Sequence, residues 1–118
     1  MKNKKIILSI LKEARIDENR TPFSPSQISY LLNRFSNLKI IVQPSERRCF
    51  KDKDYLKAGA QITDNLSSAN IVFGVKEVDI SKLIQNKIYL FFSHTSKVRQ
   101  YIGQTITDKA IIYKKELL

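Results

Sequence analysis

Several residue types that build common functional sites are scarce in this 118-residue chain. The single cysteine, Cys49, excludes an internal disulfide framework and a multi-cysteine zinc site, and the single histidine, His94, excludes sites that need two. The three glycines, Gly59, Gly74 and Gly103, are too few and too dispersed for a glycine-rich nucleotide loop. We therefore expect no metal site, and no cofactor bound by this chain alone.

Long hydrophobic runs are absent as well. No stretch approaches the ~18 apolar residues of a membrane-spanning helix. Residues 1–10 begin like a signal peptide, with a basic segment and a short apolar run, but no small-residue cleavage pattern follows Leu11. The sequence thus predicts a soluble, cytoplasmic protein with no membrane partner.

The composition that is present is that of an ordinary globular protein. Hydrophobic residues make up 42% of the chain and charged residues 27%, which argues against a disordered or collagen-like protein. A chain of 118 residues is long enough to bury a core of its own and falls within the size of one domain. We expect residues 1–118 to form a single domain.

Positive charge dominates, because 21 lysines and arginines face 11 acidic residues and give a net charge of +10. Such a surplus is compatible with an anionic small molecule or with nucleic acid. However, the basic residues are scattered from Lys2 to Lys115, and Asp52 and Asp54 interrupt the densest cluster. We therefore favour solvated basic faces and expect no specific nucleic-acid partner.

Short apolar runs alternate with amphipathic segments, which is typical of βαβ units and a parallel sheet. The expected strands span residues 5–11, 39–42, 61–63, 69–75, 88–92 and 110–113. The expected helices begin at Pro25, at Asp52, near Ile80, and after Thr95 or Ser96. This order predicts a three-layer α/β fold of the Rossmann or flavodoxin type, with a mostly parallel sheet and helices on both faces.

Two helix ends carry recognisable signals. Ser24 and Gln27 have the spacing of a capping box around Pro25, and Gly59 is placed to end the second helix in a left-handed conformation. The first helix should bury a stripe at helical spacing, formed by Ile28, Leu31, Leu32 and Phe35. We also expect Cys49 to be a small buried hydrophobe.

Three polar residues follow predicted strands: Arg20, Lys76 and His94. In an open parallel sheet the carboxyl ends of all strands lie at one edge, where ligands bind, so these residues could converge there. An arginine fork suits a carboxylate, and a lysine and a histidine can exchange protons with a substrate. Each of the three could equally be an exposed or half-buried residue without a role.

Several short segments continue this pattern in a recognisable order. They are Glu18–Pro22, Ser24-Pro25, Ile41–Arg48, Asp52, Asp54-Tyr55, Lys57–Ala60, Gly74–Glu77 and Phe91–Lys97. Together they resemble the N-terminal domain shared by alanine dehydrogenase, proton-translocating transhydrogenase and the saccharopine dehydrogenases. The Gln-Pro-Ser and Phe-Ser-His-Thr runs are most similar to the lysine–ketoglutarate reductase domain of aminoadipic semialdehyde synthase.

The resemblance implies the substrate-side half of an NAD(P)-dependent oxidoreductase that acts on amino-acid C–N bonds. In that family Lys76 and His94 match the paired acid/base residues, and Arg20 matches the arginine that holds a substrate carboxylate. The implied partners are lysine, 2-oxoglutarate or saccharopine, and a downstream domain that carries NAD or NADP.

This chain lacks the nucleotide domain, so we expect it to be inactive alone, as a fragment or as a stand-alone relic. Two other readings stay open. One is an alanine dehydrogenase-type enzyme that reductively aminates a 2-oxo acid. The other is a non-catalytic, free-standing α/β binding domain.

Overall fold

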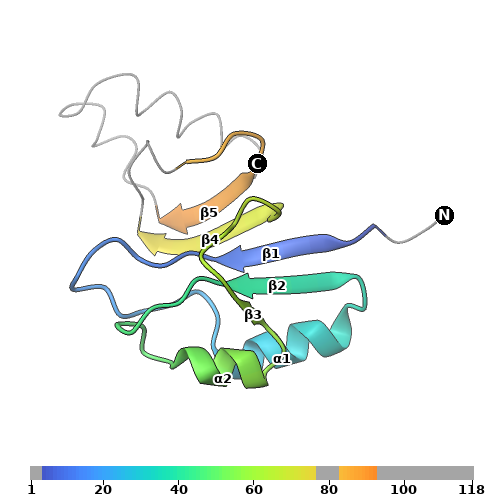
Figure 1. Cartoon of the computed structure of the whole chain (residues 1–118), viewed down its shortest axis with the longest axis horizontal. Coiled ribbons are helices and arrows are strands. Elements are labelled where there is room, and N and C mark those ends of the chain that lie inside the picture. Colours follow the sequence, from blue (N-terminus) through green and yellow to red (C-terminus); the bar gives the residue numbers. More distant parts are fainter. Residues whose placement is uncertain (1–3, 77–82, 93–118) are drawn as a thin grey trace.

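Five parallel strands form one sheet in the computed structural model of the chain, which describes residues 4–76 and 83–92. In chain order the elements are β1 (Ile6–Ile10), α1 (Pro25–Arg34), β2 (Leu38–Val42), α2 (Asp52–Lys57), β3 (Gln61–Ile62), β4 (Ile71–Lys76) and β5 (Ile88–Phe92). The strands lie in the order β3-β2-β1-β4-β5, and all neighbouring pairs are parallel. Figure 1 shows the arrowheads of β1, β2, β4 and β5 pointing to the same edge. The predicted α/β class with a parallel sheet is confirmed.

The central strand β1 sets the register of the sheet. It pairs with β2 along its whole length, from Ile6 opposite Leu38 to Ile10 opposite Val42, and with the first half of β4 on its other side. Because the middle strands are covered on both faces, they read as continuous apolar runs rather than as alternating ones. The short, β-branched runs of the sequence therefore predicted these strands within one or two residues.

The two described helices, α1 and α2, lie on the same face of the sheet (Figure 1). Their buried side chains Ile28 and Tyr55 pack against alternate residues of β1 and β2 in one core cluster. The opposite face is packed by side chains between β3 and β4 and by Leu83, which precedes β5. That second cluster contains Ile41, Leu66, Ala69, Val72, Leu83 and Tyr89.

The predicted start of α1 and the predicted left-handed glycine after α2 are both present, whereas the predicted burial of Phe35 is not. The Ser24 hydroxyl accepts a hydrogen bond from the Gln27 N–H, and the Gln27 side chain accepts one from the Ser24 N–H, so the capping box is present. Gly59 has φ +110°, in the left-handed region. The prediction that Phe35 is buried is wrong. Phe35 is the C-cap of α1, in an extended conformation; the residue is 46% exposed, and its ring lies beside the Arg34 guanidinium.

Some predicted elements fall where the structure gives no description. The helix expected after residue 95, the strand at 110–113 and His94 all lie outside the described residues. So does most of the short helix expected near Ile80, although its described end, Leu83 and Ile84, is not helical. In the described part of the chain, no helix combines the length and the apolar character needed to cross a bilayer.

Candidate functional site

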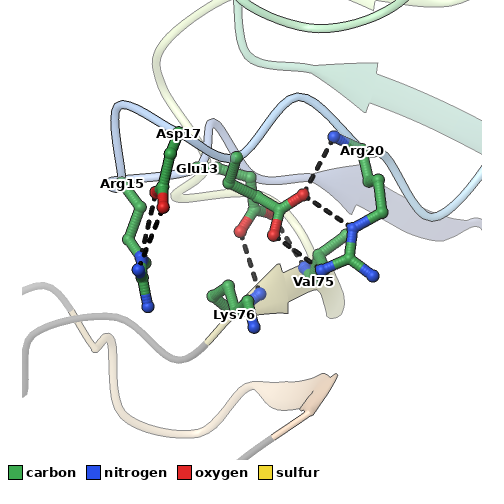
Figure 2. A network of polar contacts seen from close by, with 7 residues as sticks. Glu13, Arg15, Asp17, Arg20, Val75 and Lys76 are labelled. Carbon is green, nitrogen blue, oxygen red and sulfur yellow. Dashed lines mark hydrogen bonds and ion pairs between the residues drawn. The ribbon is translucent and has the colours of Figure 1, made fainter.

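The loop that follows β1 and the end of β4 meet at the carboxyl edge of the sheet. Arg20, from the loop, and Lys76, the last residue of β4, both line an open pocket of about 310 Å³ there. Figure 2 shows Arg20 on the loop after β1 and Lys76 at the end of β4, with carboxylate groups between them. The sequence-based expectation that they share one edge agrees with this placement. His94 lies outside the described residues, while β5, the strand that precedes it, pairs directly with β4.

Arg20 is held by Glu18, two residues earlier in the same loop. The Arg20 Nε and Nη2 atoms donate to the two Glu18 carboxylate oxygens at 2.9 and 2.8 Å, and the Arg20 backbone N–H donates at 3.0 Å. These hydrogen bonds from Arg20 lower the pKa of Glu18 to about 2, and the charge of Lys76 acts in the same direction. Glu18 is therefore ionised at neutral pH and fixes one side of the guanidinium fork.

The remaining side of the fork is accessible. The Arg20 side chain is 68% exposed, whereas that of Glu18 is only 6% exposed. Arg20 Nη1 donates no hydrogen bond to any residue in the described ranges. A carboxylate entering the pocket could therefore accept from Nη1 without displacing Glu18.

The rim of the pocket adds a second exposed ion pair. The Arg15 Nε and Nη2 atoms each donate to a carboxylate oxygen of Asp17 at 3.1 Å. These bonds lower the pKa of Asp17. Arg15, Arg20 and Lys76 outnumber the two carboxylates of the pocket lining, so its net charge is positive. An anionic ligand suits this charge balance.

Side chains and backbone from α2 and its preceding loop hold the Arg20 loop in place. The Tyr55 hydroxyl donates to the Phe23 carbonyl and lies 3.2 Å from the Thr21 hydroxyl oxygen. The Cys49 N–H donates to the Asn19 carbonyl at 2.8 Å. The loop is thus anchored on both sides of Arg20, which limits the positions that the guanidinium can take.

Sequence reasoning did not single out Glu13, which follows β1 by three residues. Its carboxylate is buried, 7% exposed, and accepts from the backbone N–H groups of Val75 at 2.8 Å and Lys76 at 2.9 Å (Figure 2). An acidic residue within a few positions of the end of a central strand, at the edge where ligands bind, was the available signal.

A second, more apolar hollow of about 490 Å³ also has Arg20 in its lining. Phe23 and Phe73 form part of its lining and meet edge to face, with ring centroids 5.0 Å apart. Arg20 therefore borders both a charged pocket and an apolar one. A ligand that combines a carboxylate with an aliphatic chain could contact both.

Two expectations about the loop after β2 are corrected. Cys49 is exposed, not buried, because its backbone makes the contact with Asn19 and its side chain faces solvent. Arg48 is one of the basic residues in the dense cluster that Asp52 and Asp54 interrupt, and it does not belong to a solvated basic face. It is 8% exposed, its Nη1 lies 3.4 Å from Asp52 Oδ1, and its guanidinium carbon lies 5.5 Å from the centre of the Tyr55 ring. Burial lowers the pKa of Arg48.

The described residues do not fit a dinucleotide. The turn after β1 carries no glycine, and the buried Glu13 carboxylate takes up the backbone N–H groups at the neighbouring strand end. A pyrophosphate needs N–H donors at such a turn and is repelled by a fixed carboxylate. In the part of the chain that is described, no three His, Cys, Asp or Glu side chains gather as metal ligands would.

Comparison with known proteins places this geometry in context. A family model described as "Alanine dehydrogenase/PNT, N-terminal domain" matches residues 9–118. The chain is 39% identical over 83 residues to alpha-aminoadipic semialdehyde synthase, mitochondrial, from Bos taurus, covering 70% of this chain and 9% of that protein. It is 31% identical over 111 residues to alanine dehydrogenase from Staphylococcus epidermidis, covering 89% of this chain and 30% of that protein.

The solved structures support the same fold. An L-alanine dehydrogenase matches 89% of this chain and 30% of its own length with a TM-score of 0.70, at 22% sequence identity. At this identity the likeness concerns the fold alone. The chain spans well under a third of the length of the curated synthase that it matches.

Proposed function

The chain belongs to the alanine dehydrogenase/PNT N-terminal domain family, and from this membership we propose that it is the substrate-binding and acid/base half of an NAD(P)-dependent oxidoreductase acting on amino-acid C–N bonds. The observation that carries the proposal is the shared pocket of Arg20 and Lys76 at the carboxyl edge of the sheet. A permanent cation and an ionisable amine in one open, net-positive pocket suit an amino acid or a 2-oxo acid.

In this proposal each residue has a separate task. Arg20, held by Glu18, binds a substrate carboxylate through its open Nη1 edge. Lys76 moves protons at the reacting nitrogen or oxygen while the imine forms and hydrolyses, together with His94. A nicotinamide nucleotide supplies or accepts the hydride and is held by a separate domain, because the described residues of this chain do not fit its pyrophosphate.

We favour lysine and 2-oxoglutarate, condensed reductively to saccharopine, or the oxidative reverse, as the reaction. The higher identity to the aminoadipic semialdehyde synthase supports this choice. The hollow beside Arg20 also offers apolar surface for a long aliphatic chain. We propose a cytoplasmic location for the enzyme.

The second candidate is an alanine dehydrogenase-type enzyme that aminates a small 2-oxo acid. The alignment to alanine dehydrogenase supports it, since it extends over 89% of this chain. The two candidates share the roles of Arg20 and Lys76 and differ in the size of the substrate.

Substrate profiling of the full-length protein tests these candidates. We expect oxidation of NADH or NADPH with lysine plus 2-oxoglutarate, and little with pyruvate plus ammonia. The opposite preference would support the alanine dehydrogenase type. Absence of turnover with both substrate pairs and both nucleotides would contradict the enzyme proposal and favour a stand-alone binding domain.

A further inference from the structure

We propose that Glu13 is a positioning residue: its carboxylate holds a bulge at the end of β4 and thereby directs the Lys76 side chain into the pocket. This inference rests on the proposed role of Lys76. It concerns a residue that does not line that pocket and that acts on Lys76 through the backbone.

The two hydrogen bonds that Glu13 accepts come from consecutive residues. Val75 N–H donates to Oε2 and Lys76 N–H donates to Oε1, at 2.8 and 2.9 Å. In a regular strand successive N–H groups point to opposite sides, so one carboxylate cannot reach both. The register between β4 and β5 also shifts between Phe73 and Lys76. The end of β4 is therefore bulged, and a bulge next to a site commonly re-aims a side chain.

The sheet itself does not supply partners for these two amides on the β1 side. The last backbone bond between the two chain segments runs from the Leu11 N–H to the Phe73 carbonyl, at 2.8 Å. After this bond the chain no longer pairs with β4. The Glu13 carboxylate instead accepts the hydrogen bonds of the Val75 and Lys76 N–H groups that a neighbouring strand would otherwise accept. Because buried N–H groups are rarely left without an acceptor, this carboxylate is needed for the observed backbone path.

Glu13 is itself fixed at both ends. Its backbone carbonyl accepts from Arg47 Nη2 at 3.2 Å, which ties it to the loop after β2. Its carboxylate lies next to Gly74, where an added Cβ would be 3.4 Å from Glu13 Oε2. Glu13 thus joins the chain after β1 to the loop after β2 and to the end of β4, and fixes the position of the Lys76 backbone.

Loss of the carboxylate should change the direction of Lys76. A strand that becomes regular by a shift of one residue turns its side chains to the opposite face. Glu13→Gln keeps one acceptor oxygen but presents an NH2 donor to the other backbone N–H. We use Glu46→Gln as the matched control, because Glu46 is an exposed carboxylate in the nearby loop after β2.

The first readout follows the backbone by amide hydrogen exchange in the full chain. In Glu13→Gln we expect exchange at Val75 and Lys76 to accelerate about tenfold or more, the effect of losing a charge-assisted bond. The amides of Ile10 and Val42 should stay protected, which shows that the sheet is intact. Unchanged exchange at Val75 and Lys76 would overturn the proposal.

The second readout follows the Lys76 side chain and does not depend on catalysis. After the Arg20 hydrogen bonds, the charge of Lys76 also lowers the pKa of Glu18. If Glu13→Gln turns Lys76 away, the pKa of Glu18 rises, as it should in Lys76→Met. Removal of the Glu13 charge alone would lower that pKa. Carboxyl-carbon NMR measures it, and a fall or no change in Glu13→Gln would overturn the proposal.

The third readout is kinetic and uses the full-length protein. Glu13→Gln should lower kcat about tenfold or more, while the KM of the 2-oxo acid held by Arg20 stays within about threefold of the wild-type value. A kcat equal to that of Glu46→Gln would reduce Glu13 to a structural role. If the wild type turns over neither substrate pair, the proposed function fails, and the first two readouts still decide whether Glu13 positions Lys76.

Discussion

The hydroxyl of Tyr55 links the core of the domain to the loop that carries Arg20, and its removal should affect both. Tyr55 is fully buried, with 0% exposure, and its hydroxyl donates to the Phe23 carbonyl beside the Thr21 hydroxyl. Tyr55→Phe keeps the ring and its packing and deletes only this hydrogen-bond donor. The variant therefore isolates the polar anchor of the loop.

The expected loss of stability follows from the Phe23 carbonyl, which loses its hydrogen-bond donor in Tyr55→Phe. Leaving a buried polar group without its partner costs about 1–3 kcal/mol. For a domain of this size each kcal/mol corresponds to about 4 °C in Tm, so we expect a decrease of about 4–12 °C. The loop should also become less well positioned, which raises the KM for the carboxylate substrate more than it lowers kcat.

Thermal melts of Tyr55→Phe and of Tyr30→Phe test this reasoning. Tyr30 lies on α1 with 65% of its surface exposed, so removal of its hydroxyl should change the free energy of unfolding by no more than about 0.5 kcal/mol. Equal Tm values for the two variants would refute the anchoring role of Tyr55. A loss of stability without any change in KM would refute the link from the anchor to Arg20.

Three further predictions concern single residues. The pKa of Glu18 is lowered from 4.5 to about 2 in the folded chain, so between these two pH values the unfolded chain binds more protons than the folded one. The free energy of unfolding should therefore fall as the pH drops from 4.5 to about 2. Urea melts at several pH values should show a smaller fall for Glu18→Gln than for the wild type. Ser24→Ala should cost about 1 kcal/mol by removing the cap of α1, and urea melts should show no such loss for the exposed Ser36→Ala. Gly59→Ala should lower the free energy of unfolding by about 1–3 kcal/mol in the same assay, because φ at Gly59 is +110° and the new Cβ would lie 2.9 Å from Leu32 Cδ1. A variant as stable as the wild type would contradict this strain.

The sheet and the helix start could be predicted because their causes are local. The apolar run at Ile6–Ile10 and the capping residues Ser24 and Gln27 each specify their own conformation. The placement of Arg20 and Lys76 at one edge also followed, since parallel strands share the edge at which they end. The roles of these two residues and of His94 remain predictions.

The contacts that organise the site could not be predicted, because they join distant parts of the chain. Glu13 meets the Val75 and Lys76 backbone across more than sixty positions, and the bulge that permits it has no sequence signature. The exposure of Cys49 and the burial of Arg48 reversed our expectations for the same reason. The geometry of the loop after β2 determines that Arg48 is buried and that Cys49 is exposed, and residue type alone does not predict this.

The central claim is that the pocket of Arg20 and Lys76 performs proton transfer on a carboxylate substrate. Its most direct test is the turnover of Lys76→Met in the full-length protein, with Lys53→Met, an exposed lysine of α2, as the control. The account predicts that Lys76→Met lowers kcat by roughly 10²–10⁴-fold, the usual contribution of a positioned acid or base, while Lys53→Met stays near wild type. Wild-type turnover by Lys76→Met would contradict it.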